Sequence, residues 1–172
     1  MATTDTIFTL SPQGAVVTET LYATFDTIID AAAAGPKSIT PVLVFDDAAA
    51  WYAEWAVEVP SHYDGGGFTW SYKGGGTGTS ATAINMDLSA RVIATATGLG
   101  TDLDLDGATV SSIDLAQSTT ANALTYSTTQ TLTHANAGSP SVGDYMIWRL
   151  TRDIGDTSTD NMNIAKVLIL ET

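Results

Sequence analysis

The chain has 172 residues, 44% of them hydrophobic, which is enough to bury the core of one ordinary domain. Its 19 Asp and Glu residues against 6 Lys and Arg residues give a formal net charge of −13. This charge argues against nucleic-acid binding by counterion release and against binding to anionic membranes. The lack of cysteine excludes disulfides, thiolate metal sites and thiol nucleophiles.

Residues 1–40 are predicted to form an N-terminal arm with one short helix, separate from a domain over 41–172. The helix is indicated by apolar residues at helical spacing, followed by the helix-ending pair Gly35-Pro36. These apolar residues are Leu21, Phe25, Ile28, Ile29 and Ala32. A strand is the alternative, because Leu21, Ala23 and Phe25 also alternate with their neighbours.

The segment up to about Gly14 is predicted to be extended, either as an arm that docks on a partner or neighbouring subunit or as a frayed terminus. It begins without a basic stretch and without a long apolar run. We therefore expect no signal peptide, and no apolar run approaches the length needed to span a bilayer.

The rest of the chain is rich in Thr and Ser, and apolar and polar residues alternate in short runs, which is typical of β-strands. The predicted strands are Val42–Phe45, Trp51–Val59, Phe68–Lys73, Ile84–Ala96, Leu124–Leu132, Tyr145–Arg152 and Asn163–Leu170. Gly, Pro and Asp cluster between these runs and indicate turns. The pattern predicts an all-β fold, an antiparallel β-sandwich of jelly-roll type. Asn163–Leu170 is almost continuously apolar, which predicts a central strand covered on both faces.

Six aromatic residues could in principle stack on sugar rings: Trp51, Tyr52, Trp55, Trp70, Tyr72 and Trp148. Trp55, Trp70 and Trp148 lie on the apolar sides of their predicted strands, so we expect them in the core. Trp51 and Tyr52 remain candidates for contact with a ligand or partner.

Asp102, Asp104 and Asp106, followed by Gly107, form the sharpest local motif. Alternate carboxylates before glycine can turn several oxygens toward Ca²⁺. The EF-hand pattern, however, requires Glu at the twelfth loop position, where this chain has Ile113. Two interpretations stay open, a calcium site and a solvated acidic loop, of which the second is favoured.

Other patterns do not reach the requirements of a known site. The stretch Gly74–Ser80 lacks the Lys of a phosphate-binding loop and precedes a strand, so we expect a flexible hairpin loop. His62 and His134 lie in predicted loops without a nucleophile motif. Glu54 and Glu58 are about 13 Å apart at the rise of a strand, too far for a glycosidase pair. We expect no enzymatic activity and no cofactor, apart from the calcium alternative.

Three segments resemble a group of tailed-bacteriophage virion proteins. Tyr52–Tyr72 contains a Tyr-Ala-x-aromatic strand ending in Pro, an Asp-Gly turn and a second apolar strand. Asp144–Asp153 and the strand that follows it look like the closing strand pair of that group, and Leu43–Asp46 resembles its opening strand. The resemblance extends over Val42–Leu170, with 98–120 poorly matched.

The resemblance implies a jelly-roll domain on a phage particle, of the capsid decoration (cement) type or a head or tail accessory type. The expected function is to bind the major capsid protein on the capsid exterior, as a homotrimer made in the host cytoplasm. The alternative is a carbohydrate-binding module of a head fibre or tail that adheres to a host glycan. No site residue is implied by this resemblance.

Overall fold

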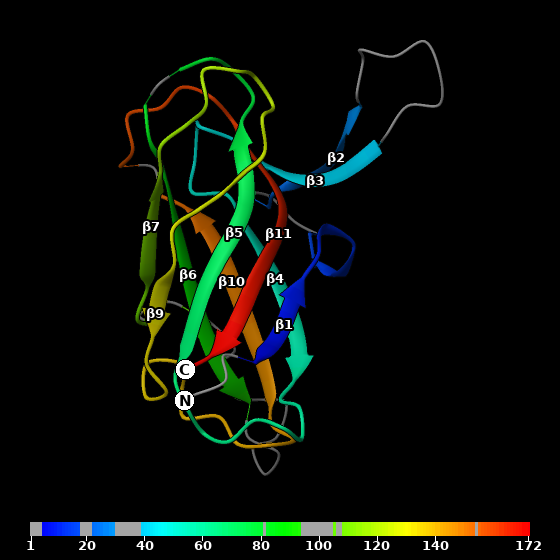
Figure 1. Cartoon of the computed structure of the whole chain (residues 1–172), viewed down its shortest axis with the longest axis vertical. Coiled ribbons are helices and arrows are strands. Elements are labelled where there is room, and N and C mark those ends of the chain that lie inside the picture. Colours follow the sequence, from blue (N-terminus) through cyan, green and yellow to red (C-terminus); the bar gives the residue numbers. More distant parts are fainter. Residues whose placement is uncertain are drawn as a thin grey trace.

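The computed structural model describes residues 5–17, 22–29, 39–80, 82–93, 105, 108–153 and 155–172, which are mostly β-strands (Figure 1). The strands are β1 Thr6–Leu10, β2 Thr24–Ile29, β3 Ile39–Phe45, β4 Tyr52–Glu58, β5 Phe68–Gly76, β6 Ile84–Ile93, β7 Ser111–Leu115, β8 Thr125–Tyr126, β9 Gln130–Leu132, β10 Tyr145–Arg152 and β11 Met162–Glu171. A short 3-10 helix, η1, spans Pro12–Gly14. In this described part, no helix is long and apolar enough to cross a membrane.

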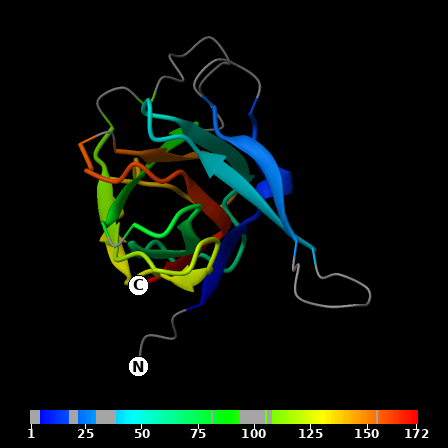
Figure 2. The same ribbon diagram turned by 90° about the horizontal axis from the view of Figure 1, so that it is seen from above.

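The strands form two antiparallel sheets that pack face to face (Figure 2). The seven-stranded sheet has the order β2-β3-β11-β5-β8, with β1 also paired to β11 and β9 to β5. The four-stranded sheet has the order β4-β10-β6-β7. From β3 to β6 the chain alternates between the two sheets, as a jelly roll requires. The predicted jelly-roll β-sandwich is therefore confirmed.

The core lies between the sheets and is built from the inward-facing residues of each strand. Trp70 and Trp148 are fully buried, and Trp55 is 3% exposed, as the alternation predicted. Phe68 meets Trp148 edge to face, with ring centroids 5.2 Å apart. Such aromatic contacts add to the stabilisation from apolar burial.

β11 is the central strand of its sheet, with β1 and β3 along one edge and β5 along the other. The prediction that both of its faces are covered holds only in part, because Asn163 is buried on the second face but the residues after it on that face are not. The face turned away from the four-stranded sheet, which we call the outer face, carries half-buried Lys166, Leu168 and Leu170. In Figure 1 this face of β5 and β11 lies toward the reader.

The predicted helix is wrong over the described residues of its span. Thr24–Ile29 is β2, which pairs antiparallel with β3 from Thr24↔Val44 to Ile29↔Ile39. Pairing with β3 satisfies the backbone of a segment rich in β-branched residues, which favour strands. The alternative, a strand, is therefore the correct type of element, but of its three residues only Phe25 lies in β2, Ala23 precedes it and Leu21 lies outside the described residues.

The predicted N-terminal arm is extended, but its described part is a strand of the sandwich. β1 pairs with β11 from Thr6↔Leu170 to Leu10↔Val167, and its residues Ile7, Phe8 and Leu10 are buried. Both β1 and β2 thus pair with strands of the predicted domain 41–172. A contact of this segment with another subunit stays a prediction.

Candidate functional site

A hollow of about 330 Å³ lies on the outer face of the seven-stranded sheet, beside the β2–β3 pair. Its polar lining consists of Asp26, Thr27, Thr77, Asn122, Asn161 and Asn163. Its aliphatic lining consists of Ile28, Ile29, Val42 and Val44. Because amides both donate and accept hydrogen bonds, this lining can hold a small polar ligand against an apolar floor.

Asn163 places an amide at the base of the hollow. It lies in β11 opposite Val44 of β3 and Gly75 of β5, and it is 3% exposed. Its neighbours Met162 and Ile164 are core residues. The Asn163 Nδ2 donates a hydrogen bond to Asn122 Oδ1 over 2.9 Å, which orients both amides.

Gly75, in the run Gly74–Gly76, lets the backbone beside Asn122 approach the sheet closely. The run forms the buried end of β5, so the prediction of a flexible hairpin loop is wrong for these three residues. A Cβ on Gly75 would collide with the carbonyl oxygen of Ala123, and one on Gly74 would lie 2.6 Å from that of Asn163. The Asn122 N–H donates to the Gly76 carbonyl over 2.9 Å. Close approach of backbone to backbone is the reason for glycine here.

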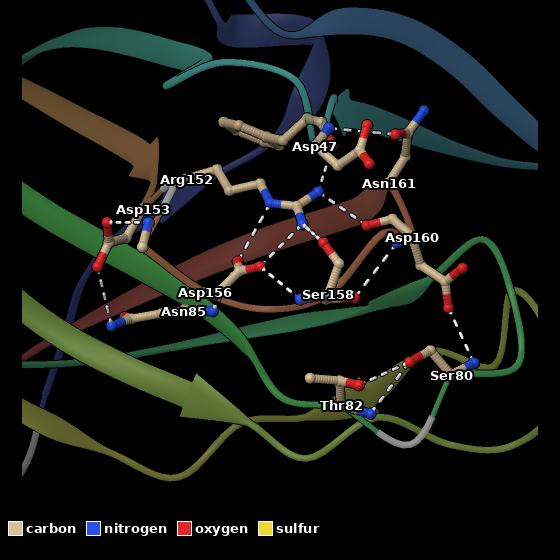
Figure 3. Close-up of polar contacts among 12 residues, drawn as sticks. Asp47, Ser80, Thr82, Asn85, Arg152, Asp153, Asp156, Ser158, Asp160 and Asn161 are labelled. Atoms are coloured by element: carbon tan, nitrogen blue, oxygen red, sulfur yellow. Dashed lines mark hydrogen bonds and ion pairs between the residues drawn. The ribbon is translucent and has the colours of Figure 1, made fainter.

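Asn161 is held from two directions. Its side-chain oxygen accepts a hydrogen bond from the Asp47 N–H over 3.3 Å (Figure 3). Its carbonyl accepts one from the Thr77 N–H over 2.8 Å. The three segments that contribute these residues are thereby tied together at the hollow.

A buried ion pair supports the segment that leads to Asn161. The Arg152 guanidinium donates to both carboxylate oxygens of Asp156, with Nε···Oδ2 at 3.2 Å and Nη2···Oδ1 at 3.1 Å (Figure 3). It also donates to the carbonyls of Ser158 over 2.9 Å and Asp160 over 2.7 Å. The two charged side chains are only 1% and 5% exposed. A bidentate pair of this kind fixes geometry more firmly than a surface pair.

Beyond the hollow, the same outer face carries an aromatic ring between two lysines. Lys73 of β5 lies opposite both Tyr126 of β8 and Lys166 of β11. The Nζ atoms of Lys73 and Lys166 lie 5.5 and 5.3 Å from the centre of the Tyr126 ring. The interaction with Lys166, chiefly its hydrogen bond, lowers the pKa of Tyr126, and the charge of Lys73 acts in the same direction.

The two aromatic candidates from the sequence lie elsewhere. Tyr52 is on the four-stranded sheet, where its ring lies 4.2 Å from the Tyr22 ring and 4.6 Å from the Arg149 guanidinium carbon. Trp51 is partly buried against the core. Neither residue lines the hollow, and a ligand or partner contact through them stays a prediction.

The three acidic candidates Asp102, Asp104 and Asp106 lie outside the described residues. Between them in sequence, Leu105 is buried, with 4% exposed. Among the residues that the structure does describe, no group of three or more His, Asp or Glu side chains could hold a metal ion. Calcium binding by this chain stays a prediction.

The two histidines have different settings. His62 is exposed in a turn. His134 is half-buried, and its Nδ1 lies 2.8 Å from the hydroxyl of Tyr63, which donates to the carbonyl of Gly66 over 2.6 Å. Burial and the nearby charges of Glu171 and Asp64 raise the pKa of Tyr63 to about 12. The expectation that the chain is not an enzyme stays a prediction.

Sequence reasoning missed the amides of the hollow. Asn122 and Asn161 sit in segments without a motif, so only their positions in the fold bring them together. A weak signal was available in β11, where Asn163 and Lys166 interrupt an otherwise apolar run. Polar residues in an apolar strand indicate a face that meets solvent or a ligand.

Comparison with known proteins shows a shared fold without a family. No family model and no curated protein matches the chain. The mosquito-larvicidal Cry4Aa toxin from Bacillus thuringiensis matches 95% of this chain and 23% of its own, with 11% identity and a TM-score of 0.54. The CBM35 from Cellvibrio japonicus Abf62 matches 94% of this chain and 91% of its own, with 13% identity and a TM-score of 0.49. The C-terminal CBM6 of LamC from Zobellia galactanivorans matches 95% of this chain and 98% of its own, with 12% identity and a TM-score of 0.48.

Proposed function

We propose that the chain is a carbohydrate-binding module that seats a sugar unit in the hollow on the outer face of the seven-stranded sheet. The observation that carries this proposal is the lining of the hollow, in which amide and hydroxyl groups from four segments surround an aliphatic floor. The proposal rests on this lining and not on the likeness to the CBM35 and CBM6 structures, whose TM-scores are below 0.5.

The arrangement suits a sugar for two reasons. Neighbouring hydroxyl groups of a sugar need paired donors and acceptors, which the side-chain amides of Asn122, Asn161 and Asn163 provide. The hollow is also held in place before a ligand arrives, because Asn163 is buried and Asn161 is tied to Asp47 and Thr77. A preformed site loses less conformational entropy on binding.

Val44 offers a direct test, since it forms part of the floor and is half-buried. We expect the wild-type protein to bind members of a broad glycan array of bacterial-surface and plant oligosaccharides. Val44→Phe fills the hollow and should weaken binding at least about tenfold, the equivalent of 1.4 kcal/mol. Calorimetric titration with the best array ligand measures this change.

Val142→Phe is the matched control, because Val142 is an exposed valine that does not line the hollow. It should leave affinity unchanged. Two outcomes would contradict the proposal: a folded wild-type protein that binds nothing on the array, or Val44→Phe binding with wild-type affinity.

Capsid decoration is a second candidate, and the β2–β3 pair favours it. Phe25, Ile29 and Ile39 are 51%, 50% and 63% exposed, and β2 is the edge strand of its sheet. Apolar side chains on an edge strand are suited to pairing with another chain. Under this proposal they would contact the major capsid protein or the neighbouring subunits of a homotrimer.

Sedimentation velocity, combined with co-sedimentation on phage heads stripped of the protein, tests the second candidate. A trimer that rebinds heads, and loses binding with Phe25→Ser, would support capsid decoration. A monomer that stays in the supernatant would overturn it. Both outcomes are independent of glycan binding, so the two candidate functions are judged separately.

A further inference from the structure

Tyr126, Lys73 and Lys166 form a row that places two positive charges side by side in a chain that is strongly acidic overall. The three residues occupy matching register positions on β8, β5 and β11, so their side chains share the outer face of the sheet. Tyr126 is 59% exposed, and both lysines are half-buried. The ring and the two ammonium groups are therefore within reach of a ligand from solvent.

Placing the two lysines opposite each other costs stability. Like charges directly across an antiparallel pair repel, and the face of the Tyr126 ring offsets only part of that repulsion. The chain has 19 acidic residues with which to neutralise 6 basic ones. Nevertheless, no carboxylate within the described ranges forms an ion pair with Lys73 or Lys166, whereas Arg149 and Arg152 both have such a partner.

The lysine row and the hollow are neighbours along β11. Asn163 and Lys166 both lie on the outer face, three residues apart, and the register shifts between Ile164 and Lys166. Three residues of a strand span about 10 Å. An oligosaccharide seated at Asn163 can therefore extend over Lys166 and the Tyr126 ring.

We infer that Lys73, Lys166 and Tyr126 form an anion subsite that selects glycans carrying acidic groups. This inference rests on the proposed glycan-binding function and names its substrate class. The two ammonium groups bind the oxygens of a carboxylate or sulfate, and the Tyr126 hydroxyl provides a further hydrogen bond. The bound anion removes the repulsion between the lysines, so part of the cost of their placement is recovered on binding.

Matched ligand pairs test the inference. Oligogalacturonate is compared with its methyl ester, and sulfated dextran oligosaccharide with plain dextran oligosaccharide, by calorimetric titration. The two pairs distinguish a carboxylate from a sulfate as the recognised group. We expect the acidic member of at least one pair to bind at least about tenfold more tightly. Salt should reduce the preference, because the charges are partly solvated.

The double variant Lys73→Gln/Lys166→Gln should abolish the preference for the acidic member and leave the melting temperature unchanged or higher. Arg91→Gln is the control, since it removes one positive charge from β6 of the other sheet. It should preserve the preference. An acidic preference that survives in the double variant would overturn the inference, as would equal binding of both members by the wild type.

Failure of the inference is distinguishable from failure of the proposed function. If neutral and acidic members bind equally and Val44→Phe weakens both, the hollow binds glycans and the anion subsite is refuted. If the acidic members bind with sensitivity to the lysines but not to Val44→Phe, the anion subsite stands without the hollow. If no ligand of either kind binds, both are refuted.

Discussion

The outer face of each sheet carries a cation beside a tyrosine ring. On the four-stranded sheet the Arg149 guanidinium carbon lies 4.6 Å from the centre of the Tyr52 ring, and Arg149 Nη2 lies 2.8 Å from Glu54 Oε1. On the seven-stranded sheet Lys73 and Lys166 lie at similar distances from the Tyr126 ring. No carboxylate of the described chain forms an ion pair with either lysine.

The difference separates two uses of charge. On the four-stranded sheet the charge of Arg149 is neutralised by Glu54. The other charges around this pair are mainly negative, as expected for a chain of net charge −13. There, burial raises the pKa of Asp87, and the charges of Asp153 and Asp114 raise it further. The positive row on the seven-stranded sheet is the exception. Charge that is neutralised within the fold supports structure, whereas charge left open is available to a ligand.

The largest expected loss of stability comes from breaking the ion pair of Arg152, the most buried charged side chain in the described structure. Arg152→Met leaves Asp156 buried without its partner and should lower the free energy of unfolding by about 3–5 kcal/mol. Urea unfolding followed by tryptophan fluorescence measures the loss. Arg152→Lys keeps the charge without the bidentate geometry and should fall between Arg152→Met and wild type. A loss below about 1 kcal/mol for Arg152→Met would contradict this prediction, because it would show that the buried pair contributes no more than a surface ion pair.

A smaller effect is expected for the half-buried ion pair of the four-stranded sheet, which is more open to solvent than the Arg152–Asp156 pair. The side chains of Arg149 and Glu54 are each 19% exposed, so Glu54→Gln should lower the free energy of unfolding by about 0.5 kcal/mol. The loss should shrink in 1 M NaCl because the Debye length falls to about 3 Å. By contrast, Lys73→Gln should cost nothing. Equal losses for the two variants would remove the distinction between neutralised and open charge.

Strands that alternate strictly could be predicted from local sequence alone. Tyr145–Arg152 was predicted with the bounds that β10 has, and Phe68–Lys73 covers most of β5. In β10 buried residues alternate with half-buried or exposed ones, and in β5 the large apolar residues all lie on the buried face, so residue type reflects the environment of each position. Fold class therefore follows from short-range pattern.

Other elements depend on distant partners, and the sequence alone could not place them. β1 becomes a strand of the sandwich because Thr6 pairs near Leu170 at the opposite end of the chain. Gly74–Gly76 extend β5 where three distant segments pack on them: β11 on Gly74, Ala123 on Gly75 and Gln117 on Gly76. The candidate site is the extreme case, since the Asn122 and Asn163 amides are far apart in sequence and only the folded sheet brings them together. In the sequence, each of these asparagines by itself is indistinguishable from an ordinary polar surface residue.

Asp87 provides a smaller, pH-dependent test of the negative face. Because burial raises its pKa in the folded protein, Asp87 contributes stability that is fully present below its unfolded pKa and lost as pH rises through the folded pKa. Asp87→Asn removes that loss and keeps an acceptor for the Ser112 hydroxyl. The difference in free energy of unfolding, Asp87→Asn minus wild type, should therefore be larger at pH 7 than at pH 3, as measured by urea unfolding. The opposite trend would show that the Asp87 carboxylate is stabilised in the fold.

The smallest effect concerns Tyr126 and sharpens the comparison at the positive row. Lys166→Met removes the interaction that lowers the pKa of Tyr126, so this pKa should rise toward the ordinary value of 10. Carbon-13 NMR titration of labelled tyrosine ring carbons measures the shift, with Tyr63, whose pKa is about 12, as an internal reference. Lys73→Met should produce a smaller rise. A pKa unchanged in both variants would mean that the lysines do not act on the ring in solution. An anion bound by the lysines screens their charge, so an acidic glycan should raise the pKa of Tyr126 in the wild type. In Lys166→Met the same glycan should raise this pKa much less.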